Sequence, residues 1–444
     1  MPDQGPKIHA DSIISTKWVA TVSRQGLLTN HSVIILQGHI LDILPTDIAL
    51  KRYTTPQHFD LGEQILTPGF INTHGHAAMT LFRGYADDLP LMTWLNDHIW
   101  PNEAKWLSAD FVTVGSELAI AEMIQSGTTL FSDNYFFTEE VGSAAIKTGI
   151  RAQLCPTILN VPTQWAKTTA AYLDRAVDTH HAFKHSDLVN GILGPHSPYV
   201  LSDQDFEKVV DQSQQLGCMI QMHVHETQDE INDSLGRYFC RPLARLDRVG
   251  MLNNQLQAVH MTQLTEHEIE LLAERDVKII HCPESNLKLA SGFCPVGALR
   301  KAGITVALGT DGAASNNDLD MLGEMRTASL LAKAVAHDAT ALNAEHALKM
   351  ATLEGARALG MEDKIGSIEI GKAADLCATD LSDFANLPIY NPISQLVYTA
   401  NRKQITHVWV AGKNLLKNKE LTTIDSALLK ANVAQWQTKI SNNL

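Results

Sequence analysis

The stretch TPGFINTHGHAAMT, residues Thr67 to Thr80, places two histidines one residue apart at the end of an apolar run. On a β-strand, residues i and i+2 point to the same face, so the imidazoles of His74 and His76 can reach one ion. A histidine near a strand end is more often a surface or hydrogen-bonded residue than a metal ligand. HxH also occurs by chance, so the pair alone does not establish a metal site.

The rest of the middle of the chain alternates between apolar runs and helical periodicity. The eight runs are ILTPGFINTHGH, GTTLFSDN, RAQLCPTI, LVNGILGPHSP, CMIQMHVHE, QAVHM, VKIIHCPESN and ITVALGTDGA. A helix is expected over 202–217, with Ser202 as its N-cap and Gly217 at its end, and another over 265–276. Eight strand–helix units in series predict an α/β fold, a parallel (β/α)8 TIM-like barrel over residues 66–365.

Both ends of the chain instead consist of short apolar runs separated by turns. HSVIILQGHILDILP is broken by a QG pair at 37–38, which is a hairpin signal. The same hairpin pattern occurs in GSIEIGKAADLCATD and THVWVAGKNLL, with GK pairs at 371–372 and 412–413. We therefore expect one small β-sandwich domain built from both termini, residues 1–65 and 366–444.

Composition narrows the class of protein. The 444 residues suit one large barrel with a smaller unit. Apolar residues make up 45% and charged residues 19%, which is typical of a globular protein. The net charge of -14 argues against nucleic acid as the main partner, because phosphate binding needs a basic face. A small nucleoside, which is held by local contacts, is not excluded.

The sequence also predicts a cytoplasmic protein without a membrane segment. The start, MPDQGPKIHADSII, lacks a basic segment followed by an apolar core, and no apolar run approaches the length of a membrane span. The scattered cysteines form no CxxC pair, so free thiols are expected rather than a disulfide scaffold. They are Cys155, Cys218, Cys240, Cys282, Cys294 and Cys377.

Polar side chains stand at the ends of most of the predicted barrel strands. They are His74 and His76, Asp133 and Asn134, His196, His223 with His225 and Glu226, His260, His281, and Asp311. A barrel brings the C-terminal ends of all its strands to one mouth, so residues far apart in the chain are expected to meet there. This convergence strengthens the metal-site interpretation of the first stretch.

Two choices follow within this group. His223 and His225 share one geometry, so either can be the third nitrogen ligand. We favour His223, because Glu226 then falls where the chain leaves the strand and can turn its carboxylate to the substrate. Asp311 follows the buried run ALGT, where a carboxylate is costly unless it meets a metal or a donor. The alternative role for Asp311 is an N-cap of the next helix.

Three histidines and one carboxylate around an ion, with room for water, describe a catalytic site of the zinc type. The ion would lower the pKa of a bound water and make a hydroxide nucleophile. His260 and Asp311 are placed to orient that hydroxide or accept its proton, and Glu226 to deliver a proton to the leaving side. The predicted chemistry is metal-assisted hydrolysis.

With these residues in place, the chain resembles the amidohydrolase superfamily, in the branch of methylthioadenosine and S-adenosylhomocysteine deaminases with triazine chlorohydrolases and guanine deaminases. The matching pieces are PGFINTHGH, WLNDHIWPNEAKW, SGTTLFSD, HVHET, HCPESNLKLASG, LGTDGAASNNDLDMLGEMR and GSIEIGKAADL, in the expected order. The resemblance implies that the metal ligands are His74, His76, His223 and Asp311. It also implies that His260 supports the attacking water and that Glu226 shuttles a proton to the purine ring.

The resemblance further implies how the substrate is held. Glu103, in the WPNE segment, corresponds to a glutamate that binds ribose hydroxyls, and His196 to a histidine on the ribose side. The segment GPHSP lacks the lysine that bridges two metals in some relatives, so one divalent metal per subunit is expected. Zinc suits the ligands, and iron or manganese also occupy such sites. A homodimer or larger homo-oligomer is implied as well.

One segment departs from the family pattern. Several members carry a second arginine shortly after GMRA-like residues, where it meets the homocysteine carboxylate. Here GIRAQLCPTI has Arg151, but Cys155 and Pro156 stand where the second arginine would fall. The departure counts against S-adenosylhomocysteine as the preferred substrate and leaves methylthioadenosine unaffected.

Three functions are weighed on this basis. The leading one is metal-dependent hydrolytic deamination of 5′-methylthioadenosine, S-adenosylhomocysteine or adenosine, by hydroxide attack at C6, to the inosine analogue and ammonia. The second is dechlorination or deamination of a triazine or of a free purine base such as guanine. The third is a catalytically inactive barrel with a binding role, whose signature would be an eroded site. Every expected position holds a competent residue, and the sequence does not rank the three nucleosides.

Overall fold

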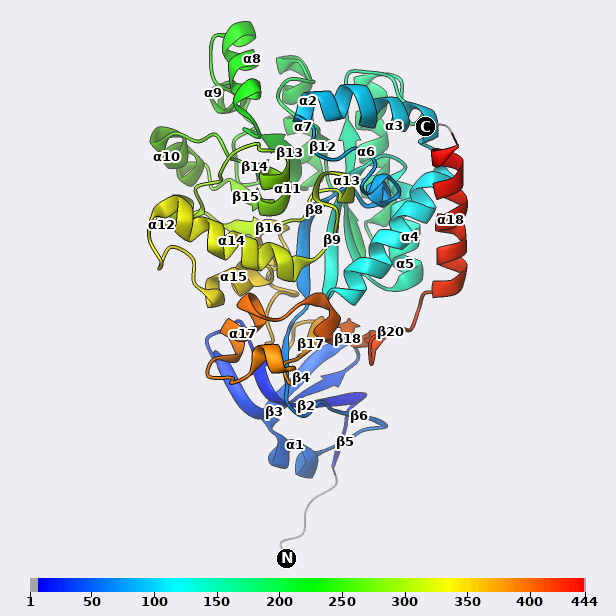
Figure 1. Ribbon diagram of the computed structural model, residues 1–444, viewed down its shortest axis with the longest axis vertical. Coiled ribbons are helices and arrows are strands. Elements are labelled where there is room, and N and C mark those ends of the chain that lie inside the picture. The colour runs from blue at the N-terminus through cyan, green and yellow to red at the C-terminus, as the bar shows by residue number, and fades with distance from the viewer. Residues whose placement is uncertain (1–6, 443–444) are drawn as a thin grey trace, which may run out of the picture.

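The eight runs form the strands of a parallel barrel in the computed structural model, which describes residues 7–442 (Figure 1). Each lies within its predicted segment or extends one residue beyond it, and the fourth is interrupted. The strands are β8 (Phe70–Gly75), β9 (Thr128–Tyr135), β10 (Arg151–Ile158), β11 (Val189–Gly191) with β12 (Gly194–Pro195), β13 (Ile220–Val224), β14 (Leu256–His260), β15 (Lys278–His281) and β16 (Val306–Leu308). The predicted TIM-like barrel is confirmed.

The barrel closes at two seams. Its strands form two hydrogen-bonded sheets, β8 to β12 and β13 to β16. Leu193 and Ile220 form a parallel bridge at one seam. At the other, Thr73 Oγ1 donates to the carbonyl oxygen of Leu308 at 2.7 Å. The first and last strands are therefore neighbours, which brings the end of β8 beside the end of β16.

Helices surround the barrel, and their caps agree with the sequence prediction. In α7 (Asp203–Leu216), the Ser202 side chain accepts from the backbone of the first turn, and Gly217 ends the helix at φ +64°. In α10 (Glu266–Glu274), Thr265 and Glu268 form a capping box. The other long helices are α4 (Ala109–Gln125), α5 (Thr138–Thr148), α6 (Thr169–Phe183), α8 (Gln228–Tyr238) and α14 (Met321–Ala336).

The shorter helices complete the barrel connections. They are α9 (Pro242–Arg248), α11 (Pro283–Lys288), α12 (Val296–Lys301), α13 (Ala313–Asn316), α15 (Ala344–Met350), α16 (Leu353–Ala358) and, beyond the barrel, α17 (Pro392–Tyr398). A covering segment, residues 91–106, lies over the C-terminal ends of the strands (Figure 1). It comprises α2 (Leu91–Thr93), the π-helical turn η2 (Trp94–Ile99) and α3 (Trp100–Trp106), and follows η1 (Ala77–Phe82).

Strands from both termini form one sheet at the opposite end of the barrel (Figure 1). Its order in the described part of the chain is β20-β19-β18-β17-β7-β2-β3-β4, with β6 paired to β2. The bounds are β2 (Ser12–Ala20), β3 (Leu27–Leu36), β4 (His39–Pro45), β6 (Gln57–Asp60), β7 (Gln64–Pro68), β17 (Leu376–Asp380), β18 (Ile405–Val410), β19 (Lys413–Lys417) and β20 (Glu420–Leu421). The antiparallel pairing of β7 with β17 joins the two ends of the chain.

Two of the three predicted hairpins form, β3–β4 and β18–β19. The one expected about 371–372 is wrong, because β17 starts only at Leu376. The preceding segment is instead held by other strands, with Ile368 donating to the carbonyl of Thr21. A small pair, β1 (Ile8–His9) with β5 (Tyr53–Thr54), and the helix α1 (Thr46–Arg52) lie outside the main sheet.

The run ILTPGFINTHGH is divided between the two units at Gly69. Residues before it form β7 of the terminal sheet, and residues after it form β8 of the barrel. A Cβ atom at Gly69 would lie 2.1 Å from Thr129 Cγ2, so only glycine allows this close passage. The glycine thereby fixes where the barrel strand carrying the two histidines begins.

The C-terminal helix α18 (Ser426–Ser441) packs along the side of the barrel (Figure 1). The Trp436 ring contacts that of Phe111 in α4 at a centroid distance of 5.3 Å. Among the helices of residues 7–442, none combines the length and apolar character that a membrane span requires.

A buried ion pair links barrel and terminal sheet. Arg151 Nε donates to Asp375 Oδ2 at 2.6 Å and Arg151 Nη2 to Oδ1 at 3.1 Å, with both side chains less than a tenth exposed. Arg151→Ala would leave the carboxylate of Asp375 buried without a cation. We expect the free energy of unfolding, measured by urea titration, to fall by about 3–5 kcal/mol.

The matched control is Arg275→Ala, which removes a pair with Asp247 at 2.8 Å whose side chains are 45% and 31% exposed. Because exposed pairs contribute little, this loss should stay below about 1 kcal/mol. Equal losses in the two variants would contradict a structural role for the buried pair.

Candidate active site

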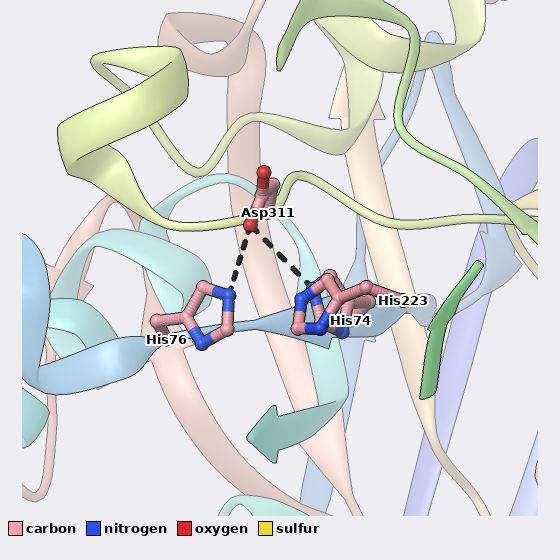
Figure 2. A group of neighbouring side chains, drawn as sticks. All are labelled: His74, His76, His223 and Asp311. Carbon is pink, nitrogen blue, oxygen red and sulfur yellow. Dashed lines mark hydrogen bonds and ion pairs between the residues drawn. The ribbon is translucent and has the colours of Figure 1, made fainter. Parts of the chain in front are cut away.

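Four side chains meet at the mouth of the barrel: His74, His76, His223 and Asp311 (Figure 2). One ligand atom from each lies within 4.8 Å of all the others. His74 Nε2 is 3.2 Å from His223 Nε2 and 3.5 Å from Asp311 Oδ1, and His76 Nε2 is 3.1 Å from the same oxygen. Three imidazole nitrogens and one carboxylate are the donor set of a catalytic metal site.

Backbone carbonyls orient two of the imidazoles. His76 Nδ1 donates to the carbonyl oxygen of Asn134 at 2.6 Å, and His223 Nδ1 donates to that of His196 at 2.8 Å. Because each Nδ1 carries the proton, each Nε2 keeps its lone pair for the centre of the group. The strand ends that supply these carbonyls thus fix the tautomer as well as the position of the rings.

A buried glutamine orients the third imidazole. His74 Nδ1 donates to Gln221 Oε1 at 2.7 Å. The Gln221 amide is itself held, because its Nε2 donates to the Thr73 carbonyl at 3.0 Å and to Gln257 Oε1 at 2.7 Å. Gln221 is not among the site residues predicted from the sequence. Its signal was a polar residue two positions before His223, on the same face of a buried strand.

Asp311 is held as an anion. Ser285 Oγ donates to Asp311 Oδ2 at 2.6 Å. Burial alone would raise the pKa of this carboxyl, but hydrogen bonds with His74 and His76 lower it well below its usual range. The residue has a left-handed backbone, φ +63°. The alternative role as helix cap is not observed, since Gly312 occupies the N-cap position of α13.

His225 points away from the group. Its backbone leaves the strand at φ +55°, which turns the ring behind β13. His225 Nδ1 donates to the Gln263 carbonyl at 3.0 Å, and His225 Nε2 accepts from the Leu243 amide at 3.3 Å. Of the two histidines left open by the sequence, the structure thus brings only His223 into the group.

Glu226 and His260 face each other beside the four residues. Glu226 Oε2 is 3.9 Å from His260 Nε2, and His260 Nδ1 donates to Asn286 Oδ1 at 2.9 Å. Burial, with the nearby charge of Asp311, raises the pKa of Glu226 to about 8. A carboxylic acid that keeps its proton at neutral pH is suited to act as a general acid.

A cavity of about 400 Å³ opens beside these residues, and Glu103 and His196 are among the side chains that line it. Glu103 belongs to the covering segment, and its Oε1 accepts from the Tyr135 hydroxyl at 2.6 Å. The His196 ring lies 4.7 Å from that of His223 between centroids. Burial lowers the pKa of His196 to about 3, so the ring is neutral. The role of Tyr135 was also missed, although it ends the second barrel strand.

Two strand-end residues remain outside the cavity. Asp133 Oδ1 accepts from the Ala77 amide at 2.6 Å and so supports the turn that follows His76. His281 is buried at the end of β15 and is not among the residues that line the cavity. Their positions in the sequence do not distinguish them from the residues that face the cavity.

Known proteins match this sequence over nearly its whole length. The sequence profile described as the amidohydrolase family matches residues 65–415. A protein of Saccharophagus degradans named 5-methylthioadenosine/S-adenosylhomocysteine deaminase is 46% identical over 435 residues, 98% of each chain. A protein of Teredinibacter turnerae with the same name is 46% identical over 431 residues, 97% of this chain and 98% of its own.

Solved structures of other proteins have the same fold over nearly the whole chain. An adenosine deaminase from Xanthomonas campestris with bound zinc has a TM-score of 0.97 and 48% identity, and the comparison covers 98% of this chain and 100% of that one. An atrazine chlorohydrolase from Arthrobacter aurescens complexed with zinc has a TM-score of 0.89, over 96% of this chain and 100% of its own. Its 21% identity shows the fold alone. The profile match and the full-length relatives show that the chain belongs to the amidohydrolase family.

Proposed function

We propose that this protein is a metal-dependent hydrolase that deaminates an adenine nucleoside at C6, giving the inosine analogue and ammonia. The observation that carries the proposal is that His76, His223 and Asp311 of the four-residue group line one cavity with Glu226 and Glu103. The names of relatives that are 46% identical over nearly the whole chain support the same reaction.

The proposed metal ligands are His74, His76, His223 and Asp311, with one divalent ion per subunit. The geometry fits, because all three Nδ1 atoms are occupied by acceptors and the Nε2 atoms face a common point. Zinc is the proposed ion, since it suits three nitrogens and one carboxylate and is bound in the Xanthomonas campestris structure. When bound, such an ion lowers the pKa of water, so that a hydroxide nucleophile is available near neutral pH.

The chain's own residues then manage the protons. Glu226, which keeps its proton at neutral pH, donates to the ring nitrogen next to C6 as the carbon–oxygen bond forms. His260 and Asp311 orient the attacking water and accept its proton. That proton goes on to the amine, the C6–N bond breaks and ammonia leaves, and the remaining proton of the C6 hydroxyl returns to Glu226 as the C6 carbonyl forms. Water is the only co-reactant, so the atoms balance.

The ribose is proposed to lie between Glu103 and His196. The carboxylate of Glu103 is fixed by Tyr135, so it can accept hydrogen bonds from the 2′ and 3′ hydroxyls in a set geometry. Neutral His196 contacts the ribose side, while Glu226 and Asp311 contact the base. A triazine or a bare purine base has no diol to engage Glu103, which weighs against the second function.

We further propose a homodimer or larger homo-oligomer, as the family resemblance implies, and a cytoplasmic location. All six cysteines are free thiols and five are buried, which suits a reducing compartment. Light scattering and cell fractionation measure these two properties, and a monomer or a periplasmic pool would contradict them.

His74→Ala removes a proposed ligand and should abolish the absorbance change of adenosine-to-inosine conversion. Because loss of an outer partner of a metal ligand already costs roughly 10–100-fold, kcat/KM should fall by more than about a hundredfold. Metal content, measured on the same sample, should fall with it. The control is His267→Ala, since the His267 side chain is 88% exposed. Activity retained by His74→Ala without bound metal would contradict the proposal.

Glu103→Gln tests the ribose contact. A hydrogen bond to a charged group contributes about 1.5–3 kcal/mol, so kcat/KM for adenosine should fall roughly 10–150-fold. The Tyr135 hydroxyl can still donate to the amide oxygen of the introduced glutamine, which keeps the local structure. With 2′,3′-dideoxyadenosine, which lacks both hydroxyls, wild type and variant should differ by less than about threefold. Equal losses on both nucleosides would show that Glu103 does not bind the diol.

A further inference from the structure

The cavity has an uneven distribution of charge. Its lining includes the carboxyl side chains of Glu103, Glu226 and Asp311, of which Glu226 keeps its proton at neutral pH, but within residues 7–442 it includes neither lysine nor arginine. The histidines that line it belong to the inner end, with the four-residue group. The reacting end of the base is placed at the proposed metal. The described part of the lining offers a substrate no other positive partner.

The remaining walls are apolar or neutral. The covering segment contributes Leu91, Trp94, Leu95, Ile99 and Trp100. The loop after β10 contributes Leu159 and Val161, together with the uncharged polar residues Asn160, Thr163 and Gln164. Such walls favour a thioether or a methyl group, because burial of apolar surface is favourable without any specific partner.

We infer that this enzyme selects adenine nucleosides with an uncharged 5′ substituent, such as methylthio, and discriminates against those whose 5′ substituent carries a carboxylate, such as S-adenosylhomocysteine. The inference rests on the proposed function. A carboxylate that leaves water needs a cation or several donors, and an unpartnered one is costly. With the reacting end of the base at the proposed metal, the side chains of residues 7–442 left to line the rest of the cavity are neutral, apolar or negative.

Two lysines that are adjacent in sequence to lining residues already have interaction partners. Lys288, which precedes the lining residue Leu289, pairs with Asp87 at 2.7 Å. Lys105 lies over the ring of Trp106, 4.9 Å from its centroid, and Trp106 does not line the cavity. Neither is placed to neutralise a substrate carboxylate.

A third lysine provides the sharpest internal check. Lys167 Nζ donates to the carbonyl oxygen of Thr163 at 2.6 Å, so it is anchored to the loop at the cavity rim. Its side chain is exposed and is not part of the lining. If the enzyme does recruit a cation for a carboxylate, Lys167 is the candidate to turn inward, because it is anchored to a lining residue.

The test compares kcat/KM for four nucleosides. 5′-Methylthioadenosine and 5′-butylthioadenosine are uncharged. 5′-(3-Carboxypropylthio)adenosine and S-adenosylhomocysteine have carbon chains of the same length as butylthio but end in a carboxylate, and S-adenosylhomocysteine also carries an α-ammonium group that the carboxypropylthio compound lacks. Losing one hydrogen bond to a charged group corresponds to roughly a tenfold effect or more. We expect kcat/KM for the two uncharged compounds to agree within tenfold. For each carboxylate compound, kcat/KM should lie more than tenfold below that of 5′-butylthioadenosine.

Either of two results would overturn the inference. In the first, kcat/KM for the carboxylate compounds lies within tenfold of kcat/KM for 5′-butylthioadenosine. In the second, kcat/KM for 5′-butylthioadenosine falls as far as theirs, which would make the length of the substituent the cause. If none of the four nor adenosine is deaminated, the proposed function itself fails. Lys167→Ala should leave the ratio of kcat/KM for methylthioadenosine and S-adenosylhomocysteine unchanged. A selective loss on S-adenosylhomocysteine would assign Lys167 as the missing cation and also overturn the inference.

Discussion

The hydrogen bonds that close the barrel between its first and last strands are the interactions on which the site depends. The Asp311 amide donates to the His74 carbonyl at 3.0 Å. Just before these two residues in the chain, Asn72 and Thr310 exchange hydrogen bonds of 2.7 and 2.9 Å. Because these contacts align β8 with the end of β16, the carboxylate of Asp311 lies beside the two histidines of HxH, 235 positions or more away.

A polar network inside the barrel holds this arrangement. Gln221 contacts His74 on one side and Gln257 on the other, and Gln257 continues to Gln153 at 3.1 Å. Burying amides is costly unless each is paired, so the chain of glutamines is stable only as a set. Its consequence is chemical: the His74 ring is locked in one tautomer, and little reorganisation is needed when a metal binds.

Much of this was predictable because it depends on local pattern. The barrel strands, the caps at Ser202 and Thr265 and the positions of the strand-end histidines follow from periodicity and turn chemistry. What could not be predicted depends on backbone direction and on contacts between strands. His225 turns away only because its φ is positive, and Gln221 acquires its role only when β13 faces β8. The hairpin expected at 371–372 failed because strands distant in sequence hold that segment.

The cavity has two chemically different parts. Its inner end supplies nitrogen, carboxylate and acid groups that suit a hydrolytic metal, while its outer walls, as far as residues 7–442 form them, are apolar or neutral and contain no lysine or arginine. Both features arise from the loops at the C-terminal ends of the strands, where barrels place their chemistry. The terminal sheet at the other end leaves that face free.

Titration of metal-free protein with zinc, with deamination of methylthioadenosine followed at each addition, tests the single-ion account most directly. Activity should be absent at first, rise linearly and saturate at one equivalent per chain. Activity in the metal-free protein, or a rise that continues to two equivalents, would contradict it.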